Sequence, residues 1–312
     1  MIAVLCGGVG AARMLGGLVQ VREEAEIAAV VNTGDDTVMH GLYICPDLDT
    51  ITYTLSGSVN PETGWGLAGE SWQAMDSLER LGGRDRTWFR LGDRDLGTHL
   101  YRTGRLAEGA SLSQVTAEIA RAFGLGLQLL PMTDDPVRTV LRRVGGGELA
   151  FQEYFVRHRH EVAVEAVFLV GARRARPTAQ VLEALERADQ VVVAPSNPVV
   201  SIGPILSLPG VRELLAARRS SVVAVSPIVG GTALKGPADR LLVELGGQAS
   251  PAGVAERLTE VAGSLVIDEV DAAWKKAVEA AGMRAVVAPT VMSDPGRARH
   301  LAQVVLAAGS PG

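Results

Sequence analysis

The stretch that decides the fold is residues 2–31, IAVLCGGVGAARMLGGLVQVREEAEIAAVV. Its first five residues form an uninterrupted apolar run, which is typical of a strand covered on both faces of a parallel sheet. Glycines end that run, and the spacing of the apolar residues after them predicts a helix over residues 11–21. A second apolar run at 27–31 completes a βαβ unit, for which a right-handed crossover is expected.

The same alternation returns in the second half of the chain. Apolar runs predict further strands at 167–170, 191–194, 222–225, 265–267 and 285–287, and helices are expected at 178–187 and 295–308. Residues 61–160 break this rhythm with three of the four tryptophans and mainly helical stretches such as 112–123. We therefore predict an α/β fold with a doubly wound, mostly parallel, Rossmann-like sheet. Residues 1–60 and 161–312 form this core, and residues 61–160 form an inserted, largely helical subdomain.

Composition narrows the class of protein without naming a function. The 312 residues are 47% hydrophobic, which excludes a disordered chain. No apolar run approaches the ~20 residues that cross a bilayer. The net charge of −5 argues against a nucleic-acid surface, and two cysteines cannot form a disulfide framework. We expect a cytoplasmic protein whose partners are small molecules, with no nucleic acid and no membrane.

The glycine segment after the first strand predicts an anion site. Gly8 and Gly10 allow a phosphate to approach the backbone, and the start of the following helix offers free N–H donors. Arg13 could hold a phosphate with two hydrogen bonds. Because Arg13 stands where a dinucleotide fingerprint has its third glycine, and no GK[ST] follows, NAD binding and a Walker loop are disfavoured. A plain strand-to-helix turn is the alternative.

A cluster of carboxylates follows the second strand. Asp35 and Asp36 come directly after Asn32 and Thr33, and Asp47 and Asp49 follow within fifteen residues. Four carboxylates so close together repel one another unless cations or donors intervene. Oxygen ligands of this kind suit Mg²⁺, which usually binds one or two carboxylates together with substrate phosphates. We predict a magnesium site here; solvated loop aspartates are the alternative.

Other polar segments follow predicted strands or lie in the insertion. Ser196 and Asn197 stand between two prolines after the strand at 191–194, and Gly230 and Lys235 follow the strand at 222–225. Their shared position at strand ends favours ligand binding over plain turns. Residues 88–99, rich in Arg and Asp, suggest a polar site with an aromatic wall, or an exposed ion-pair loop. Thr133 or Asp134 is expected to cap a helix that begins near Pro136.

With these segments in view, the chain resembles the 2-phospho-L-lactate transferase or phosphoenolpyruvate transferase family of coenzyme F420 biosynthesis. The resemblance rests on ordered motifs that run almost end to end: 7–13, 31–36, 45–50, 91–95, 131–136, 151–155, 195–198, 201–204 and 225–228. It implies transfer of a phosphoenolpyruvyl or 2-phospho-L-lactyl group from a guanosine diphospho donor to the terminal ribityl hydroxyl of the deazaflavin Fo. GMP leaves, and F420-0 or its dehydro form is the product.

The resemblance also assigns residues. It places the acceptor Fo at Asp49 and Arg90, on the side of the inserted subdomain, and it implies a homodimer. His99, which lies near the Arg- and Asp-rich segment, is a further candidate for acceptor binding. Asp47, Asp49 and Arg90 are the expected catalytic residues, and Mg²⁺ is the expected cofactor, bound by Asp35, Asp36 and Asp47. The expected donor-binding residues are Gly8, Gly10, Arg13, Asn32, Thr33, Ser196, Asn197, Gly230 and Lys235.

Two other functions compete with this interpretation. A nucleotide-sugar-binding regulator of a related family has a similar glycine loop followed by acidic residues, but residues 46–50 and the segment near 90 match the transferase. An NAD-dependent enzyme is disfavoured by Arg13 and by the acidic loop. The sequence does not distinguish phosphoenolpyruvate from phospholactate, although an Arg-rich composition favours a GC-rich bacterium and phosphoenolpyruvyl transfer.

Overall fold

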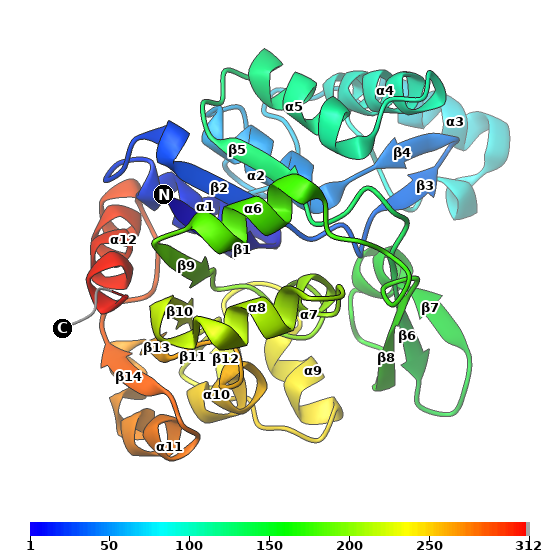
Figure 1. Ribbon diagram of the computed structural model, residues 1–312. Helices are drawn as coiled ribbons and strands as arrows, with labels where there is room; N and C mark the ends of the chain where they lie inside the picture. The colour runs from blue at the N-terminus through cyan, green and yellow to red at the C-terminus, as the bar shows by residue number, and fades with distance from the viewer. Residues whose placement is uncertain (310–312) are drawn as a thin grey trace.

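The computed structural model describes residues 1–309, and a seven-stranded sheet lies at its centre (Figure 1). Every neighbouring pair of strands in this sheet is parallel. The strand order is β14-β13-β10-β9-β1-β2-β5. The strands are β1 (Ile2–Cys6), β2 (Ile27–Val31), β5 (Gln128–Pro131), β9 (Gln190–Val193), β10 (Val222–Val225), β13 (Ser264–Ile267) and β14 (Arg284–Val287). The predicted α/β class and parallel sheet are confirmed.

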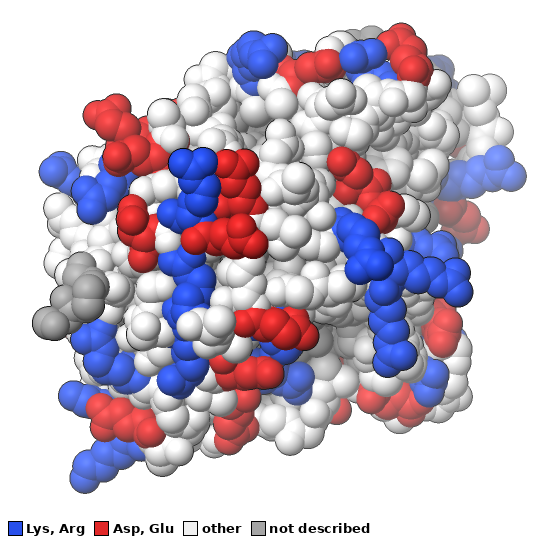
Figure 2. Space-filling view, in the orientation of Figure 1, with Lys and Arg blue, Asp and Glu red and all other residues white. Residues whose placement is uncertain are grey.

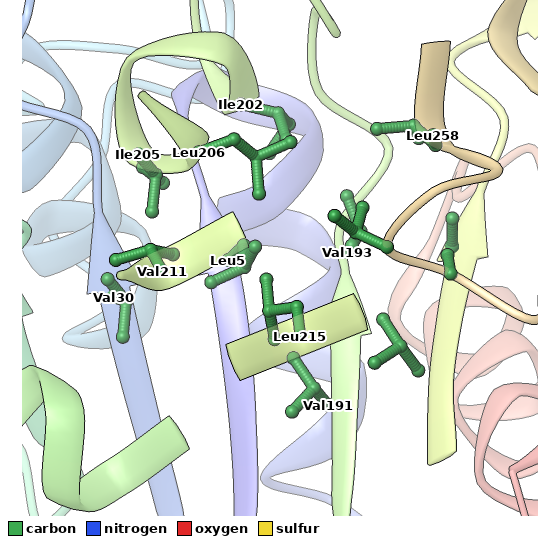
Figure 3. Packing of buried hydrophobic residues seen from close by; sticks show 14 of the residues in the cluster. Leu5, Val30, Val191, Val193, Ile202, Ile205, Leu206, Val211, Leu215 and Leu258 are labelled. Atoms are coloured by element: carbon green, nitrogen blue, oxygen red, sulfur yellow. The ribbon is translucent and has the colours of Figure 1, made fainter. Parts of the chain in front are cut away.

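Both faces of the sheet are covered, which explains the continuous apolar runs. Side chains alternate along β1, so that Leu5 joins one buried cluster and Val4 joins the other. One cluster, part of which is shown in Figure 3, packs under α6 (Ala179–Arg187), α7 (Ile202–Leu206), α8 (Val211–Ala217), α9 (Ala238–Glu244), α10 (Pro251–Leu258) and α11 (Lys275–Ala280). The other packs under α1 (Gly8–Leu18), α2 (Pro46–Leu55), α5 (Leu112–Ala122) and α12 (Pro295–Ala308).

The strand order places a topological switch point between β1 and β9. From β1 the chain moves to β2 on one side, whereas β9 leads to β10, β13 and β14 on the other side. The connections that leave β1 and β9 therefore run in opposite directions at the carboxyl ends of these strands. In open parallel sheets, ligands bind in the crevice at this point.

Residues 61–160 contain helices and strands. The helices are α3 (Gln73–Gly82), α4 (Asp93–Ala107) and α5, whereas β5 pairs with β2 as the edge of the central sheet. Two more strands, β6 (Arg138–Arg143) and β7 (Glu148–Ala150), form an antiparallel hairpin. The range expected to be a largely helical insertion thus contributes one strand to the core.

The strand expected at 167–170 does not belong to the central sheet. It is part of β8 (Val164–Val170), which pairs antiparallel with β6 in a separate three-stranded sheet. The chain reverses between β6 and β7 at Gly145, Gly146 and Gly147, all of which have positive φ. An apolar run predicts a strand but not its partner; the partner here is β6, which also pairs with β7 across this glycine turn.

The prediction of a helix near Pro136 is also wrong, because the strand β6 follows instead. Proline disfavours helical geometry at the residue before it, here Asp135. The Thr133 hydroxyl accepts from the Asp135 amide and donates to the Arg176 carbonyl, so it holds a turn rather than a helix start.

The surface carries both signs of charge. Figure 2 shows acidic and basic side chains interspersed over one face of the molecule. None of the helices among residues 1–309 is long and apolar enough to cross a membrane.

Candidate active site

The glycine segment forms the first turn of α1 rather than a loop before it. The helix begins at Gly8, three residues earlier than the spacing predicts, and Gly8 has a φ of +69°. Its amide donates to Asp47 Oδ1 at 2.7 Å. A Cβ on Gly10 would lie 2.3 Å from the carbonyl oxygen of Pro195, which follows β9. Only glycine therefore allows the start of α1 to pack against the end of β9.

Asn32 joins the end of β2 to the first turn of α2. Its Nδ2 donates to Asp35 Oδ1 and to Asp47 Oδ2, both at 3.0 Å, and its Oδ1 accepts from the Gly34 amide at 2.8 Å. Asp47 thus touches both the glycine turn and Asn32. Burial raises the pKa of Asp47 to about 6. Burial, together with the charge of Asp47, also raises the pKa of Asp35. The structure brings these predicted residues together.

Asp36 holds a buried carboxylate that lacks partners. Neither of its oxygens accepts a hydrogen bond, although the Cys45 thiol lies beside it, and the Thr33 hydroxyl is buried and unpartnered as well. Burial raises the pKa of Asp36, and this effect outweighs the opposing influence of the Cys45 thiol and of the Arg102 charge. Buried polar atoms without partners are uncommon in proteins and are typical of sites that await a ligand or an ion.

These carboxylates do not form a closed metal cage. Within residues 1–309, no three Asp, Glu, His or Cys side chains are arranged to hold a metal ion. Mg²⁺ commonly takes only one or two carboxylates and completes its shell with water and substrate phosphates. Asp35, Asp36 and Asp47 offer oxygen atoms of the kind that Mg²⁺ binds, but they do not form a ligand group by themselves, so the magnesium site stays a prediction.

Asp49 lies in a buried ionic network between α2 and α4. Both of its oxygens accept from the guanidinium of Arg102, which is 2% exposed. Burial alone would lower the pKa of Arg102, but Asp49 outweighs it and raises that pKa. His99 lies between Arg102, 3.1 Å from its Nδ1, and Asp95, 3.3 Å from its Nε2. Tyr53 donates to the same Asp95 at 2.6 Å.

Sequence reasoning missed Arg102. It lies three residues after His99, on the same face of α4, so helical spacing could have connected the two. That connection requires α4 to be recognised as a helix that begins at Asp93, whereas the segment up to residue 99 reads from sequence as a polar loop. Arg102 donates to both oxygens of Asp49. The predicted contact between Asp49 and the acceptor would therefore require one of these hydrogen bonds to break or its oxygen to accept a second hydrogen bond.

Arg90 lies apart from this network in its contacts. Its guanidinium pairs with Asp76 at 2.6 Å and Glu79 at 3.5 Å, both on α3, and stacks over the Trp72 ring at 5.4 Å. The Arg90 side chain is 40% exposed. None of these contacts joins it to Asp49, so the acceptor role of Arg90 stays a prediction.

Ser196 and Asn197 line the other side of the switch point. The Ser196 hydroxyl donates to the Gly7 carbonyl at 2.8 Å, which connects the ends of β9 and β1. Asn197 accepts from the Val199 amide at 2.9 Å, while its Nδ2 is buried without a partner. One donor group of this predicted pair is thus available to a ligand.

Two cations from distant segments meet near the glycine turn. Lys235 follows the hairpin of β11 (Ile228–Val229) and β12 (Thr232–Ala233), and its Nζ donates to the Thr63 carbonyl at 2.7 Å. A Cβ on Gly64 would lie 3.0 Å from that Nζ and 3.5 Å from Val9 of the glycine turn. Partial burial and the positive charge of Arg13 lower the pKa of Lys235.

The amide of Gly230, another predicted donor-binding residue, already has a hydrogen-bond partner. Its amide already donates to Asp271 Oδ2 at 2.9 Å. The predicted donor contact of Gly230 therefore has to use another atom, or replace that bond.

The fold and the contacts together define the class of protein: a parallel α/β protein with a glycine turn, an acidic cluster and nearby cations around the switch point. Proteins that bind nucleoside phosphates have sites of this kind. The family model of 2-phospho-L-lactate transferase CofD matches residues 2–300. A phosphoenolpyruvate transferase of Streptomyces griseus is 44% identical over 94% of this chain and 93% of its own. Phosphoenolpyruvate transferases of Thermobifida fusca and Mycobacterium avium are 42% and 40% identical, with at least 94% of each chain covered.

Solved structures show the same fold at lower identity. Two crystal structures of a Bacillus halodurans protein, described in one case as a UPF0052 family member, match 98% of both chains. Their TM-scores are 0.67 and 0.65, and their identity is 16%.

The chain belongs to the 2-phospho-L-lactate transferase family. This membership confirms the predicted family and the predicted class of activity, a transferase of coenzyme F420 biosynthesis.

Proposed function

We propose that the protein transfers a phosphoenolpyruvyl group from a guanosine diphospho donor to the terminal ribityl hydroxyl of Fo, releasing GMP and forming dehydro-F420-0. The single observation that carries the donor side of this proposal is the position of Lys235 Nζ beside Gly64, next to the glycine turn, where the charge of Arg13 lowers its pKa. Neither cation forms an ion pair among the described residues. Like charges held together repel unless an anion lies between them, and a diphosphate supplies that anion.

The choice of the phosphoenolpyruvyl group over 2-phospho-L-lactyl rests on the relatives. The three relatives described above, at 40–44% identity, are each named a phosphoenolpyruvate transferase. The two groups differ by only two hydrogens, so the contacts described above accommodate either. Phospholactyl transfer is the alternative substrate for the same site.

Different residues around the switch point bind different parts of the donor. The amides at the start of α1, Arg13 and Lys235 face the diphosphate, and Ser196 and Asn197 face the nucleoside. Asn197 offers its unpartnered Nδ2 for this purpose. Thr33 offers a hydroxyl that likewise has no partner.

The acidic cluster fits the expected Mg²⁺ as a partial ligand set. Asp35, Asp36 and Asp47 supply hard oxygen atoms, and the buried Asp36 carboxylate has the Cys45 thiol beside it but no hydrogen bond of normal geometry. When bound there, Mg²⁺ would offset the negative charge that develops on the donor diphosphate. The protein's own part is to hold these oxygens beside the glycine turn, through Asn32 and the Gly8 amide.

The reaction asks little covalent chemistry of the protein. The ribityl oxygen forms a bond to the phosphorus that carries the organic acid, and the bond from that phosphorus to the bridging oxygen breaks. GMP leaves with the bridging oxygen and its electron pair, and the hydroxyl proton passes to a carboxylate of the cluster or to water. Positioning and charge neutralisation therefore supply most of the rate enhancement.

The proposal is tested by measuring GMP formation with purified protein, Fo and each guanosine diphospho donor, with Mg²⁺ and with excess chelator. GMP should form only when both substrates and Mg²⁺ are present. A parallel binding panel with GDP, a UDP-sugar and NAD separates the alternatives. Tight binding of the UDP-sugar without GMP formation would overturn the proposal in favour of a nucleotide-sugar-binding regulator. The predicted homodimer is checked by light scattering of the same sample.

A further inference from the structure

Residues 58–68, which lie between α2 and α3, form a loop whose two ends are side by side. The Ala68 amide donates to the Ser58 carbonyl at 2.8 Å, and Val59 and Leu67 pair as an antiparallel bridge. At this base of the loop, Leu67 is buried. A loop of this length with adjoining ends is an Ω-loop, a type that is frequently functional.

The tip of this loop, residues 60–66, is held together by hydrogen bonds of its own. Within it, the Asn60 amide donates to the Gly66 carbonyl at 2.9 Å, and the Thr63 hydroxyl donates to the Trp65 carbonyl at 2.6 Å. Trp65 is 53% exposed. Because these bonds join residues of the tip to one another, the tip can move as a unit without breaking them.

Among residues 1–309, one hydrogen bond ties this tip to the rest of the protein. The Thr63 carbonyl accepts it from Lys235 Nζ at 2.7 Å. A Cβ on Gly64 would lie 3.0 Å from the same Nζ and 3.5 Å from Val9 of the glycine turn. The tip therefore lies beside the start of α1, where the proposed function puts the donor diphosphate.

A glycine with a left-handed backbone stands on each side of the loop. Gly57 has a φ of +69°, and Gly69 has a φ of +67°. A Cβ on Gly57 would meet no atom within 4 Å, so its backbone conformation rather than packing favours glycine there. Next to Gly69, the Ala68 carbonyl accepts from Arg94 at 2.5 Å, which anchors the base. The two glycines therefore stand where a hinge can absorb a change in φ and ψ.

Lys235 can bind the tip and a phosphate at the same time. An ammonium group has three N–H donors, and the Thr63 carbonyl accepts from one of them. A phosphate oxygen can accept from another, in a charge-assisted hydrogen bond. When the loop is closed, the Lys235 side chain is already held in place, so it loses less rotamer freedom on binding phosphate. The closed loop therefore binds the donor more tightly than the open loop, and the donor in turn favours closure.

We propose that residues 58–68 are a lid that closes over the bound donor, with Lys235 as its latch. The proposal rests on the proposed function, because it takes the donor diphosphate as the group under the lid. Closure excludes water from the phosphorus that carries the organic acid. Attack by water would form a bond from its oxygen to that phosphorus and break the bond to the bridging oxygen, giving GMP and the free organophosphate. The lid thus keeps the group for the ribityl hydroxyl.

The β6–β7 turn offers a matched control for the hinge at Gly57. Gly145 also has a positive φ, it is exposed, and a Cβ on it would meet no atom within 4 Å. This turn joins two strands of the separate three-stranded sheet. Alanine at Gly145 therefore introduces the same kind of backbone strain as alanine at Gly57, without a lid to displace.

Hydrogen exchange of the full-length protein tests closure directly. Saturating GDP should slow exchange of the amides of residues 58–68 about fivefold or more and leave the turn at 144–147 unchanged. Lys235→Met, saturated at a higher GDP concentration, should lose this protection. Equal protection in Lys235→Met, or none in wild type with GDP bound, would overturn the lid and leave the proposed function in place. If wild type does not bind GDP, both fall.

The ratio of the two products tests the exclusion of water. Wild type and Gly145→Ala should form GMP and the deazaflavin product in equal amounts. Gly57→Ala disfavours the left-handed backbone of the closed loop, so GMP should exceed the deazaflavin product about twofold or more. Both variants should lower the unfolding midpoint by similar amounts, which keeps the comparison valid. Equal amounts of the two products in Gly57→Ala would overturn the proposed role of the lid.

Discussion

The donor side and the acceptor side of the candidate site use the same residue types but are built differently. On the donor side, residues at the ends of β1, β2 and β9 touch one another directly, through Asn32, Asp47 and Ser196. On the acceptor side, Asp49 is closed off by Arg102, while Arg90 is engaged with α3. The ends of neighbouring parallel strands meet by geometry, whereas the side chains of an inserted helical segment meet only as its tertiary packing dictates.

The sharpest contrast is between two arginine–aspartate pairs. Arg102→Met would leave the buried Asp49 with only His99 Nδ1, at 3.7 Å, beside it, and the free energy of unfolding of the protein should fall by about 3–5 kcal/mol. Arg90→Met breaks an exposed pair with Asp76 and should cost about 0–1 kcal/mol. Urea unfolding of both variants measures this difference. Equal losses would show that the acceptor side has no buried ionic network.

Because Asp49 is part of the buried ionic network, the activity of an Asp49 variant alone does not show whether Asp49 takes part in the reaction. Asp49→Asn leaves Arg102 without its paired carboxylate, so loss of activity would be mixed with loss of stability. The double variant Asp49→Leu with Arg102→Met removes both charges and should recover much of the stability of wild type. Recovery of stability without recovery of transfer would assign Asp49 a direct part in the reaction.

Asp47 tests the donor side with less effect on the fold. Asp47→Asn keeps an oxygen for the Gly8 amide, loses the acceptor for Asn32 Nδ2 and removes a charge from the proposed cation site, so the rate of GMP formation should fall about 10²- to 10³-fold. Asp134→Asn is the matched control, because Asp134 is exposed and outside the site and its new amide can still accept from Ser113. A control that lost as much activity would point to a general effect of lost charge.

Two glycines of one helix separate packing from helix propensity. Gly10→Ala places a Cβ 2.3 Å from the Pro195 carbonyl oxygen and should destabilise the protein by about 1–3 kcal/mol, with weaker GDP binding. Gly16→Ala meets no atom within 4 Å and should stabilise it by about 0.5–1 kcal/mol. Thermal unfolding with and without GDP measures both changes. A tolerated Gly10→Ala would contradict the close contact between the start of α1 and the end of β9.

The smallest effect is expected at Lys235. Lys235→Met should weaken GDP binding about tenfold, which is typical of one lost charge-assisted hydrogen bond, and leave Fo binding unchanged. Lys275→Met, which changes an exposed lysine of α11, is the control. The Lys235 effect should also shrink at high salt, because partly exposed charges are screened. A change in Fo binding alone would place Lys235 on the wrong side of the site.

The sequence predicts those elements of the fold that have local signals, and it does not predict pairings between distant segments. The strand at 2–6 and the closing helix at 295–308 lie where their patterns place them, because apolar runs and a proline at a helix start are local signals. The edge strand β5 and the pairing of β8 with β6 are not local, since neither run states its neighbour.

The site divides in the same way. Position at a strand end predicts that Asp35, Asp47 and Asn32 lie together, and they do. The partner of Asp49 lies 53 residues further along the chain, on another helix, and no spacing rule connects the two. The hydrogen bond from Lys235 to the Thr63 carbonyl joins residues 172 positions apart, and no sequence pattern predicts it either.

The central claim is the transfer of an organophosphate group to Fo, and mass spectrometry of the deazaflavin product tests it most directly. Purified protein is incubated with Fo and an equimolar mixture of the phosphoenolpyruvyl and 2-phospho-L-lactyl donors, and the products are resolved by their difference of two hydrogens. The account predicts dehydro-F420-0 as the main product, with an equal amount of GMP. Unchanged Fo in the presence of both donors and Mg²⁺ would contradict it.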